Sequence, residues 1–259
     1  MTQQTENYYY GKGRVSVATR DPVTKVLGPW IWAMDVSAFA AKPTVQMVQH
    51  KESYSGQSAL AKNFPSERAL QLDMTLDNWS PENLALALYG TINKTVTGTV
   101  TAESLPATVA VGDDVRLANP GVSALVLTDS TPTTPKTLVL DTDYTIDPNF
   151  GRISILNVTG YVQPFKAAYS FAQRTDVGIF SQGQPDISVL YEGINLAENN
   201  AGVIAEFYKV APAPLQDLML ITTGNDTAGM AITAGVLIDQ SKPATGPLGQ
   251  FGRITTVGI

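Results

Sequence analysis

The sequence contains no cysteine and a single histidine, His50. The missing thiols exclude disulfides, zinc–thiolate sites and cysteine nucleophiles. His50 lies in a strand-like pattern, and we interpret it as an ordinary polar residue of a strand. We therefore expect no histidine-based catalytic triad or dyad and no multi-histidine metal site.

Charged residues are also scarce, at 15% of the 259 residues, against roughly 25% in a typical soluble domain. A surface poor in charge suits a protein that buries much of its exterior against other subunits. An ordinary threonine-rich β protein is the alternative explanation. The net charge is −6, and residues 175–259 hold eight Asp/Glu against three Lys/Arg. This acidic balance disfavours nucleic-acid binding through counterion release.

Long apolar runs are absent as well, since none approaches the roughly 18 residues that a membrane helix needs. The first residues lack the basic and then apolar pattern of a signal peptide. The sequence therefore predicts a soluble chain without a membrane anchor, made in a cytoplasm.

The clearest local pattern lies in residues 66–90. Between residues 69 and 77, leucine or methionine alternates with polar residues, as in a strand with one dry and one wet face. Ser80 can accept a hydrogen bond from a free N–H at a helix start, and Pro81 suits the first helical turn. This predicts a helix over residues 81–89 that Gly90 ends.

The rest of the chain reads as strands. In the main part they are expected at residues 14–18, 30–34, 45–52, 186–192, 203–210, 218–221 and 230–238. Residues 95–174 contain their own regular set of short strands, which indicates an inserted domain. Residues 53–65 are expected to form a long loop, and residues 1–13 an exposed N-terminal arm.

The predicted fold class is therefore mainly β: a β-sandwich or partial barrel with one flanking α-helix, plus an inserted small all-β domain. Residues 14–94 and 175–259 form the main domain, and residues 95–174 the insert. The Thr-rich entry to the insert and the return of the earlier alternation after Asp176 support this division.

No motif predicts catalysis. Asp141, Asp143 and Asp147 resemble part of a calcium loop, but the central Asp-Gly and the closing Glu are missing. Gly11-Lys12-Gly13 lacks the remaining glycine of a phosphate loop. We expect a protein that is not an enzyme and holds no cofactor or metal.

Three stretches resemble the tail tube (major tail) proteins of long-tailed bacteriophages. They are residues 52–56 (ESYSG), residues 66–90 ending WSPENLALALYG, and residues 189–195 (VLYEGIN) with the strand at 203–210 that follows them. The hairpin pattern of residues 143–153 is common in phage structural proteins and adds weaker support.

The resemblance implies a structural virion protein that polymerises as stacked hexameric rings into a tube, the conduit for genome delivery. It implies assembly in the host bacterial cytoplasm and location in the tail of the virion. The partners would be other copies of the chain, together with tail terminator, tape measure and distal tail proteins. DNA would pass through the lumen without specific binding, and the insert would lie on the tube exterior.

The resemblance also suggests which residues make contacts. The loop and the arm are the elements expected to stack the rings. The residues expected to make contacts between rings are therefore Tyr8, Tyr9, Tyr10, Tyr54, Leu60 and Phe64. Acidic residues at polar positions of alternating strands are expected to face the lumen, namely Asp73, Asp77, Glu192 and Glu206.

Two other classes remain open. One is the inner tube of a contractile tail or injection apparatus, which would not be expected to carry a bulky outward insert. The other is a carbohydrate-binding or adhesin-like β module, which would be expected to gather aromatic residues on one face of the insert.

Overall fold

The computed structural model describes residues 6–223 and 227–258. The chain divides into two compact units, the first made of residues 1–92 and 177–259 and the second of residues 93–176. We call them the main unit and the insert unit. The limits predicted for the insert were residues 95 and 174. As predicted, the fold is mainly β, with a single short helix among the described residues.

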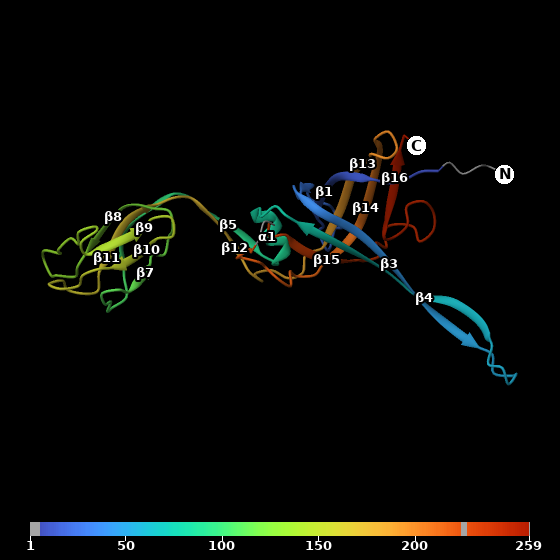
Figure 1. The fold of residues 1–259 in the computed structure, drawn as a ribbon, viewed down its shortest axis with the longest axis horizontal. Coiled ribbons are helices and arrows are strands. Elements are labelled where there is room, and N and C mark those ends of the chain that lie inside the picture. The colour runs from blue at the N-terminus through green and yellow to red at the C-terminus, as the bar shows by residue number, and fades with distance from the viewer. Residues whose placement is uncertain (1–5, 224–226, 259) are drawn as a thin grey trace. The chain divides into compact units, whose positions relative to one another are not determined.

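The main unit contains an eight-stranded antiparallel sheet with the order β2-β1-β13-β14-β15-β4-β3, and β16 also pairs with β14 (Figure 1). Its strands are β1 (Gly11–Thr19), β2 (Ile31–Trp32), β3 (Val36–Lys51), β4 (Leu60–Leu76), β13 (Ile187–Asn195), β14 (Ala201–Pro212), β15 (Met230–Val236) and β16 (Gly252–Val257). One edge of β14 pairs along its length with β13. The other edge pairs first with β16 and then, in its last residues, with β15.

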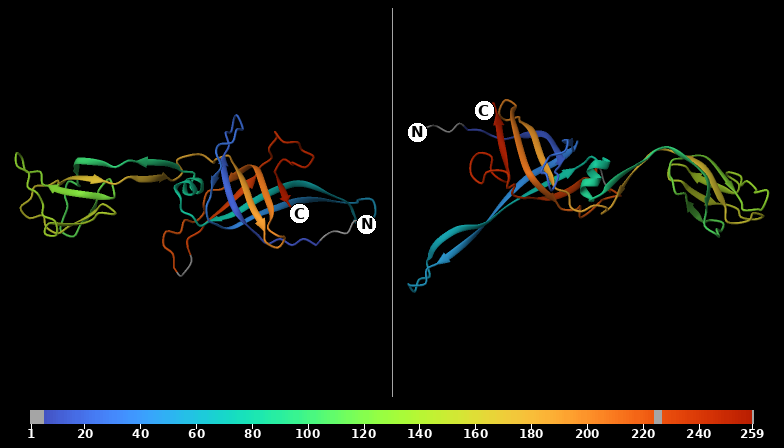
Figure 2. Two further views of the ribbon diagram at one scale, coloured as in Figure 1. Left: turned by 90° about the horizontal axis from the view of Figure 1, so that it is seen from above. Right: turned by 180° about the vertical axis from the view of Figure 1, so that it is seen from behind.

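The sheet curls around one apolar core, as the two views in Figure 2 show. Leu72, Met74 and Leu76 of β4 are buried in it, which confirms the alternation read from the sequence. On β3, the ring of Phe39 stacks on Tyr191 at 5.8 Å between centroids and meets Phe207 edge-on at 6.1 Å. Because β3 thus faces β13 and β14 across the core, the sheet forms a partial barrel.

Helix α1 (Pro81–Ala87) covers this core and begins as predicted. The Ser80 side chain accepts a hydrogen bond from the backbone N–H of Asn83 at 3.1 Å. The helix ends two residues earlier than predicted, because Tyr89 takes a positive φ of 49°. Gly90 is needed for a different reason: a Cβ there would lie 2.6 Å from the carbonyl oxygen of Gly178.

One predicted strand of the main unit is wrong. Residues 218–221 form part of a loop, in which Leu218 packs against the core while Leu220 and Ile221 are exposed. An apolar run of this length fits a strand, a helix turn or a loop equally well, so periodicity alone could not decide.

A buried ion pair fixes the segment before β16. Nη2 of Arg20 donates to Oδ2 of Asp239 at 2.9 Å, and both side chains are almost fully buried. Lys242 lies over the ring of Tyr208 at 4.9 Å, and the Tyr208 hydroxyl donates to the carbonyl oxygen of Leu248. Residues 239–251 are thereby held against the outer face of β14.

The insert unit is a small sandwich of two three-stranded sheets that share one core, with strand orders β6-β11-β8 and β7-β10-β9. Its strands are β6 (Gly98–Ser104), β7 (Asp114–Arg116), β8 (Val122–Thr128), β9 (Tyr144–Asp147), β10 (Arg152–Ile155) and β11 (Lys166–Phe171). The chain enters through β5 (Thr91–Thr95) and leaves through β12 (Arg174–Gly178), which pair with each other.

Two buried carboxylates brace the loops of this sandwich. Asp143 accepts hydrogen bonds from the Tyr161 hydroxyl, the Val139 N–H and the Asn157 side chain, which together lower its pKa. Burial alone would raise the pKa of Asp129. Hydrogen bonds from its loop, including the Thr131 hydroxyl, instead hold that pKa well below its usual value.

Candidate functional site

The outstanding feature of the main unit is the far half of the β3–β4 hairpin, residues 42–69, which we call the ribbon (Figure 1). It runs from the last core contacts of the two strands to the tip beyond Lys51. Apart from Glu52, every residue of the ribbon is exposed. Two paired strands without a covering layer are marginal in water, so the ribbon is a surface without a partner in the subunit.

The ribbon carries apolar side chains that nothing in the subunit covers. They are 41–53% exposed and comprise Val45, Met47, Val48, Leu60 and Phe64. Val48 lies directly across from Phe64, and Met47 across from Pro65. Lys62 lies over the Phe64 ring at 5.8 Å from its centroid. Apolar groups gathered on one protruding element are typical of an interaction surface.

The structure corrects the loop predicted for residues 53–65. The connection spans only residues 52–59, and Leu60 and Phe64 lie on β4. The strand was missed because both of its faces are in water, so its sequence shows no alternation of apolar and polar residues. Pro65 also disfavours a strand because it has no N–H to donate to the ladder, but it is tolerated here beside a β-bulge.

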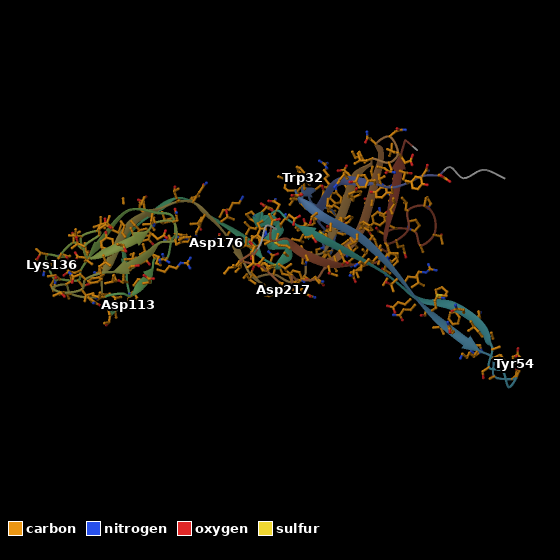
Figure 3. All side chains as sticks on the ribbon, viewed as in Figure 1. Trp32, Tyr54, Asp113, Lys136, Asp176 and Asp217 are labelled. Carbon is orange, nitrogen blue, oxygen red and sulfur yellow. The ribbon has the colours of Figure 1, made fainter. Side chains whose placement is uncertain are left out.

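The tip of the ribbon is organised by the Glu52 carboxylate, which is 7% exposed. It accepts hydrogen bonds from the backbone N–H groups of Ser55 at 2.8 Å and Tyr54 at 3.2 Å, and from the Ser55 hydroxyl. These bonds lower the pKa of Glu52, the Ser55 hydroxyl contributing most. The Tyr54 side chain projects from this turn and is 90% exposed (Figure 3).

The three tyrosines of the expected arm are tied to their own subunit. Oδ1 of Asn195 accepts from the Tyr10 N–H at 2.9 Å, while Nδ2 donates to the Tyr8 carbonyl oxygen at 2.7 Å. The hydroxyl oxygens of Tyr9 and Tyr191 lie 3.2 Å apart. Burial, followed by the contact with Tyr9, raises the pKa of Tyr191 to about 12. All three arm rings are exposed, and β1 already begins at Gly11 rather than at residue 14.

The four acidic residues expected in a lumen lie on strands β4, β13 and β14 or just after β4, and three of them are ion-paired. Asp73 pairs with Lys42 at 2.5 Å, Glu192 with Arg14 at 2.8 Å and Glu206 with Arg253 at 2.9 Å. Within the described residues, Asp77 has no ion-pair partner. These pairs mean that the acids contribute less net charge to the surface than the sequence suggested.

Free sheet edges form a second unpartnered feature. β2 and β3 end the strand order, and β16 pairs with β14 alone in the described part of the chain. A cavity of about 710 Å³ is lined by residues of the arm, β1, β3, β13, β14 and β16, with Phe39, Tyr191, Phe207 and Ile254 in its wall. Exposed edges invite strand pairing with another chain unless they are covered.

Residues 6–223 and 227–258 contain no group of three or more His, Cys, Asp or Glu that could hold a metal ion. They also contain no helix with the length and apolar character needed to cross a membrane. The candidate contact surfaces of the main unit are the ribbon, its tip and the sheet edges.

The length of the ribbon and the role of Glu52 were not predicted. The Val, Met and Gln content of residues 42–52 fits a strand longer than the one predicted at 45–52, and it could have indicated the greater length. Comparison with curated proteins finds no match. The family model described as "Protein of unknown function UCP028589" matches residues 8–255. The chain belongs to this family.

Proposed function

We propose that this chain is a structural protein that assembles with copies of itself into stacked hexameric rings, forming the tail tube of a long-tailed bacteriophage. The observation that carries the proposal is the ribbon. Its exposed apolar side chains have no cover in their own subunit. A second copy of the chain would supply that cover.

Charge is distributed in a way that favours contact between copies. The ribbon holds four Lys/Arg and two Asp/Glu, whereas the rest of the main unit holds seven Lys/Arg and 13 Asp/Glu. The positive ribbon of one copy is thus attracted to the negative body of another. A contact between two different surfaces of the same chain is heterologous, and such contacts propagate into rings or filaments.

The sheet edges suit closure of a ring. Joining the partial barrels of neighbouring subunits edge to edge would remove the free edges of β3 and β16. The part of the outer face of β13 and β14 that residues 239–251 leave uncovered would then line the lumen. On that face the opposite charges cancel within the pairs Arg14–Glu192 and Arg253–Glu206. DNA would therefore meet no strongly basic wall to which it could adhere.

On this proposal the chain has no catalytic role and resides in the virion tail. Its partners beyond itself are tail terminator, tape measure and distal tail proteins, and the insert unit decorates the tube exterior. The tyrosines of residues 8–10 and the ribbon residues Tyr54, Leu60 and Phe64 are assigned to contacts between rings.

Sedimentation velocity across a concentration series, followed by negative-stain microscopy of the fastest species, tests the proposal. We expect large assemblies that appear as discs and stacked tubes. A chain that stays monomeric at all concentrations and binds a glycan array would instead support an adhesin-like module and overturn the proposal.

A further inference from the structure

The proposed function leaves open which surface of the neighbouring copy receives the ribbon. Resting on that function, we propose that Tyr54 at the ribbon tip inserts into the crevice beside helix α1 of a second copy. The crevice is a cavity of about 210 Å³ in the main unit. Its lining includes Val17, Ile31, Ala85, Leu86 and Ile187, with Glu82 among its polar residues.

The crevice has the size and character to receive a phenol ring. An apolar cavity of roughly 150 Å³ is enough to admit a benzene ring, and this crevice is larger. Most of its lining is apolar, while Glu82 and Gln182 offer acceptors for a tyrosine hydroxyl. Tyrosine buried at its ring and bonded at its tip is a frequent anchor of protein interfaces.

The tip cannot reach the crevice of its own subunit. Tyr54 lies beyond one end of β4, and α1 follows its other end. The 17 residues of β4 span about 55 Å at roughly 3.3 Å each. Asp217 marks the α1 end of the main unit, because its loop is joined to α1 by the hydrogen bond from the Leu215 N–H to the Ala87 carbonyl oxygen. Figure 3 shows Tyr54 and Asp217 at opposite ends of this unit. Only the tip of a second copy can therefore reach this crevice, and the contact is head to tail.

Charge supports the same pairing. Lys51 and Lys62 flank the tip on the two strands of the ribbon. No Lys or Arg lines the crevice, and Glu82 lies in the first turn of α1. Opposite charges at the two surfaces orient the approach and favour this contact over tip-to-tip pairing.

The turn at the tip is already formed in the single subunit. The Glu52 hydrogen bonds fix the turn that presents Tyr54. Ordering a flexible loop would otherwise consume roughly 1–2 kcal/mol per residue, so a preformed turn retains more of the contact energy. Tyr54→Ala should therefore raise the concentration at which assembly begins by about tenfold or more, whereas Tyr54→Phe should change it far less.

Cysteine cross-linking tests the pairing cleanly, because the natural chain has no cysteine. The variant Gln57→Cys/Gln182→Cys places one thiol at the tip and one at the crevice while keeping Tyr54. The variant Gln57→Cys/Ile194→Cys is the matched control, since Ile194 is exposed on β13 away from the crevice. Both are assembled, oxidised and analysed by non-reducing gels and peptide mass spectrometry.

We expect a ladder of cross-linked copies and a peptide joining positions 57 and 182, with no such ladder in the control. If the protein assembles but positions 57 and 182 link no better than the control pair, the crevice assignment is wrong and the proposed function stands. If the natural chain does not assemble at all, the proposed function fails and this pairing fails with it.

Discussion

Replacing Leu60 and Phe64 with serine removes apolar surface from the ribbon without touching the core. The two side chains are 53% and 41% exposed, and neither belongs to the core cluster of the main unit. Each has one cross-strand neighbour, Lys51 and Val48. Such pairs contribute roughly 0.2–1 kcal/mol each, so the free energy of unfolding of the subunit should fall by about 0.4–2 kcal/mol.

The effect on association should be larger. Full burial of a Leu or Phe side chain contributes roughly 1.5–3 kcal/mol. The exposed fractions leave about 0.8–1.6 kcal/mol for Leu60 and about 0.6–1.2 kcal/mol for Phe64 to be gained at a contact, or about 1.4–2.8 kcal/mol for both. Each contact should then weaken about 10- to 100-fold. Linked contacts around a ring would multiply this loss.

Sedimentation velocity measures assembly, and the fluorescence of Trp30, Trp32 and Trp79 reports unfolding of the main unit during a urea titration. Val23→Ser/Val26→Ser is the matched control, because these valines are 84% and 66% exposed in the same unit but lie off the ribbon. We expect the control to assemble normally. Normal assembly of the Leu60/Phe64 variant, or an equal loss in the control, would show that the ribbon's apolar side chains do not drive association.

Three further predictions concern the two units. Asp143→Asn should destabilise the insert unit by about 1–3 kcal/mol at pH 7, since donors that bond the carboxylate lose a partner. Because the folded pKa of Asp143 is lowered, its contribution is complete above the unfolded value of about 3.9 and is lost as the pH falls through the folded value. Pulse proteolysis of the insert in urea should therefore show the difference shrinking below about pH 4, and a constant difference would contradict this. Arg20→Met should cost the main unit about 3–5 kcal/mol in urea titrations by leaving Asp239 buried and unpaired, and a loss under about 1 kcal/mol would show that the pair is unimportant. Replacing residues 96–173 with a short Gly/Ser linker should preserve assembly, because β5 and β12 pair and can close the gap; folded but monomeric protein would place the insert within the ring contacts.

The sequence predicted those elements that have one dry face. The alternation of residues 69–77 follows from β4 lying half on the core, and the helix start follows from the Ser80 cap and Pro81. Both features depend on residues that are close together in the sequence, so one sequence is enough to predict them.

The ribbon could not be predicted in the same way. Its strands are in water on both faces within the subunit, so neither face imposes a pattern on residues 60–68. The pairing of Glu192 with Arg14 joins side chains that lie far apart in the sequence, so their proximity is decided by the fold. The same is true of the α1 crevice, which brings together β1, β2, α1 and the segment before β13.

Electron cryomicroscopy of the purified protein at high concentration would image the proposed assembly itself. We expect stacked rings in which each ribbon is covered by a neighbouring copy and its tip reaches the α1 end of that copy. Particles that remain single subunits, or assemblies in which residues 42–69 stay in solvent, would contradict it.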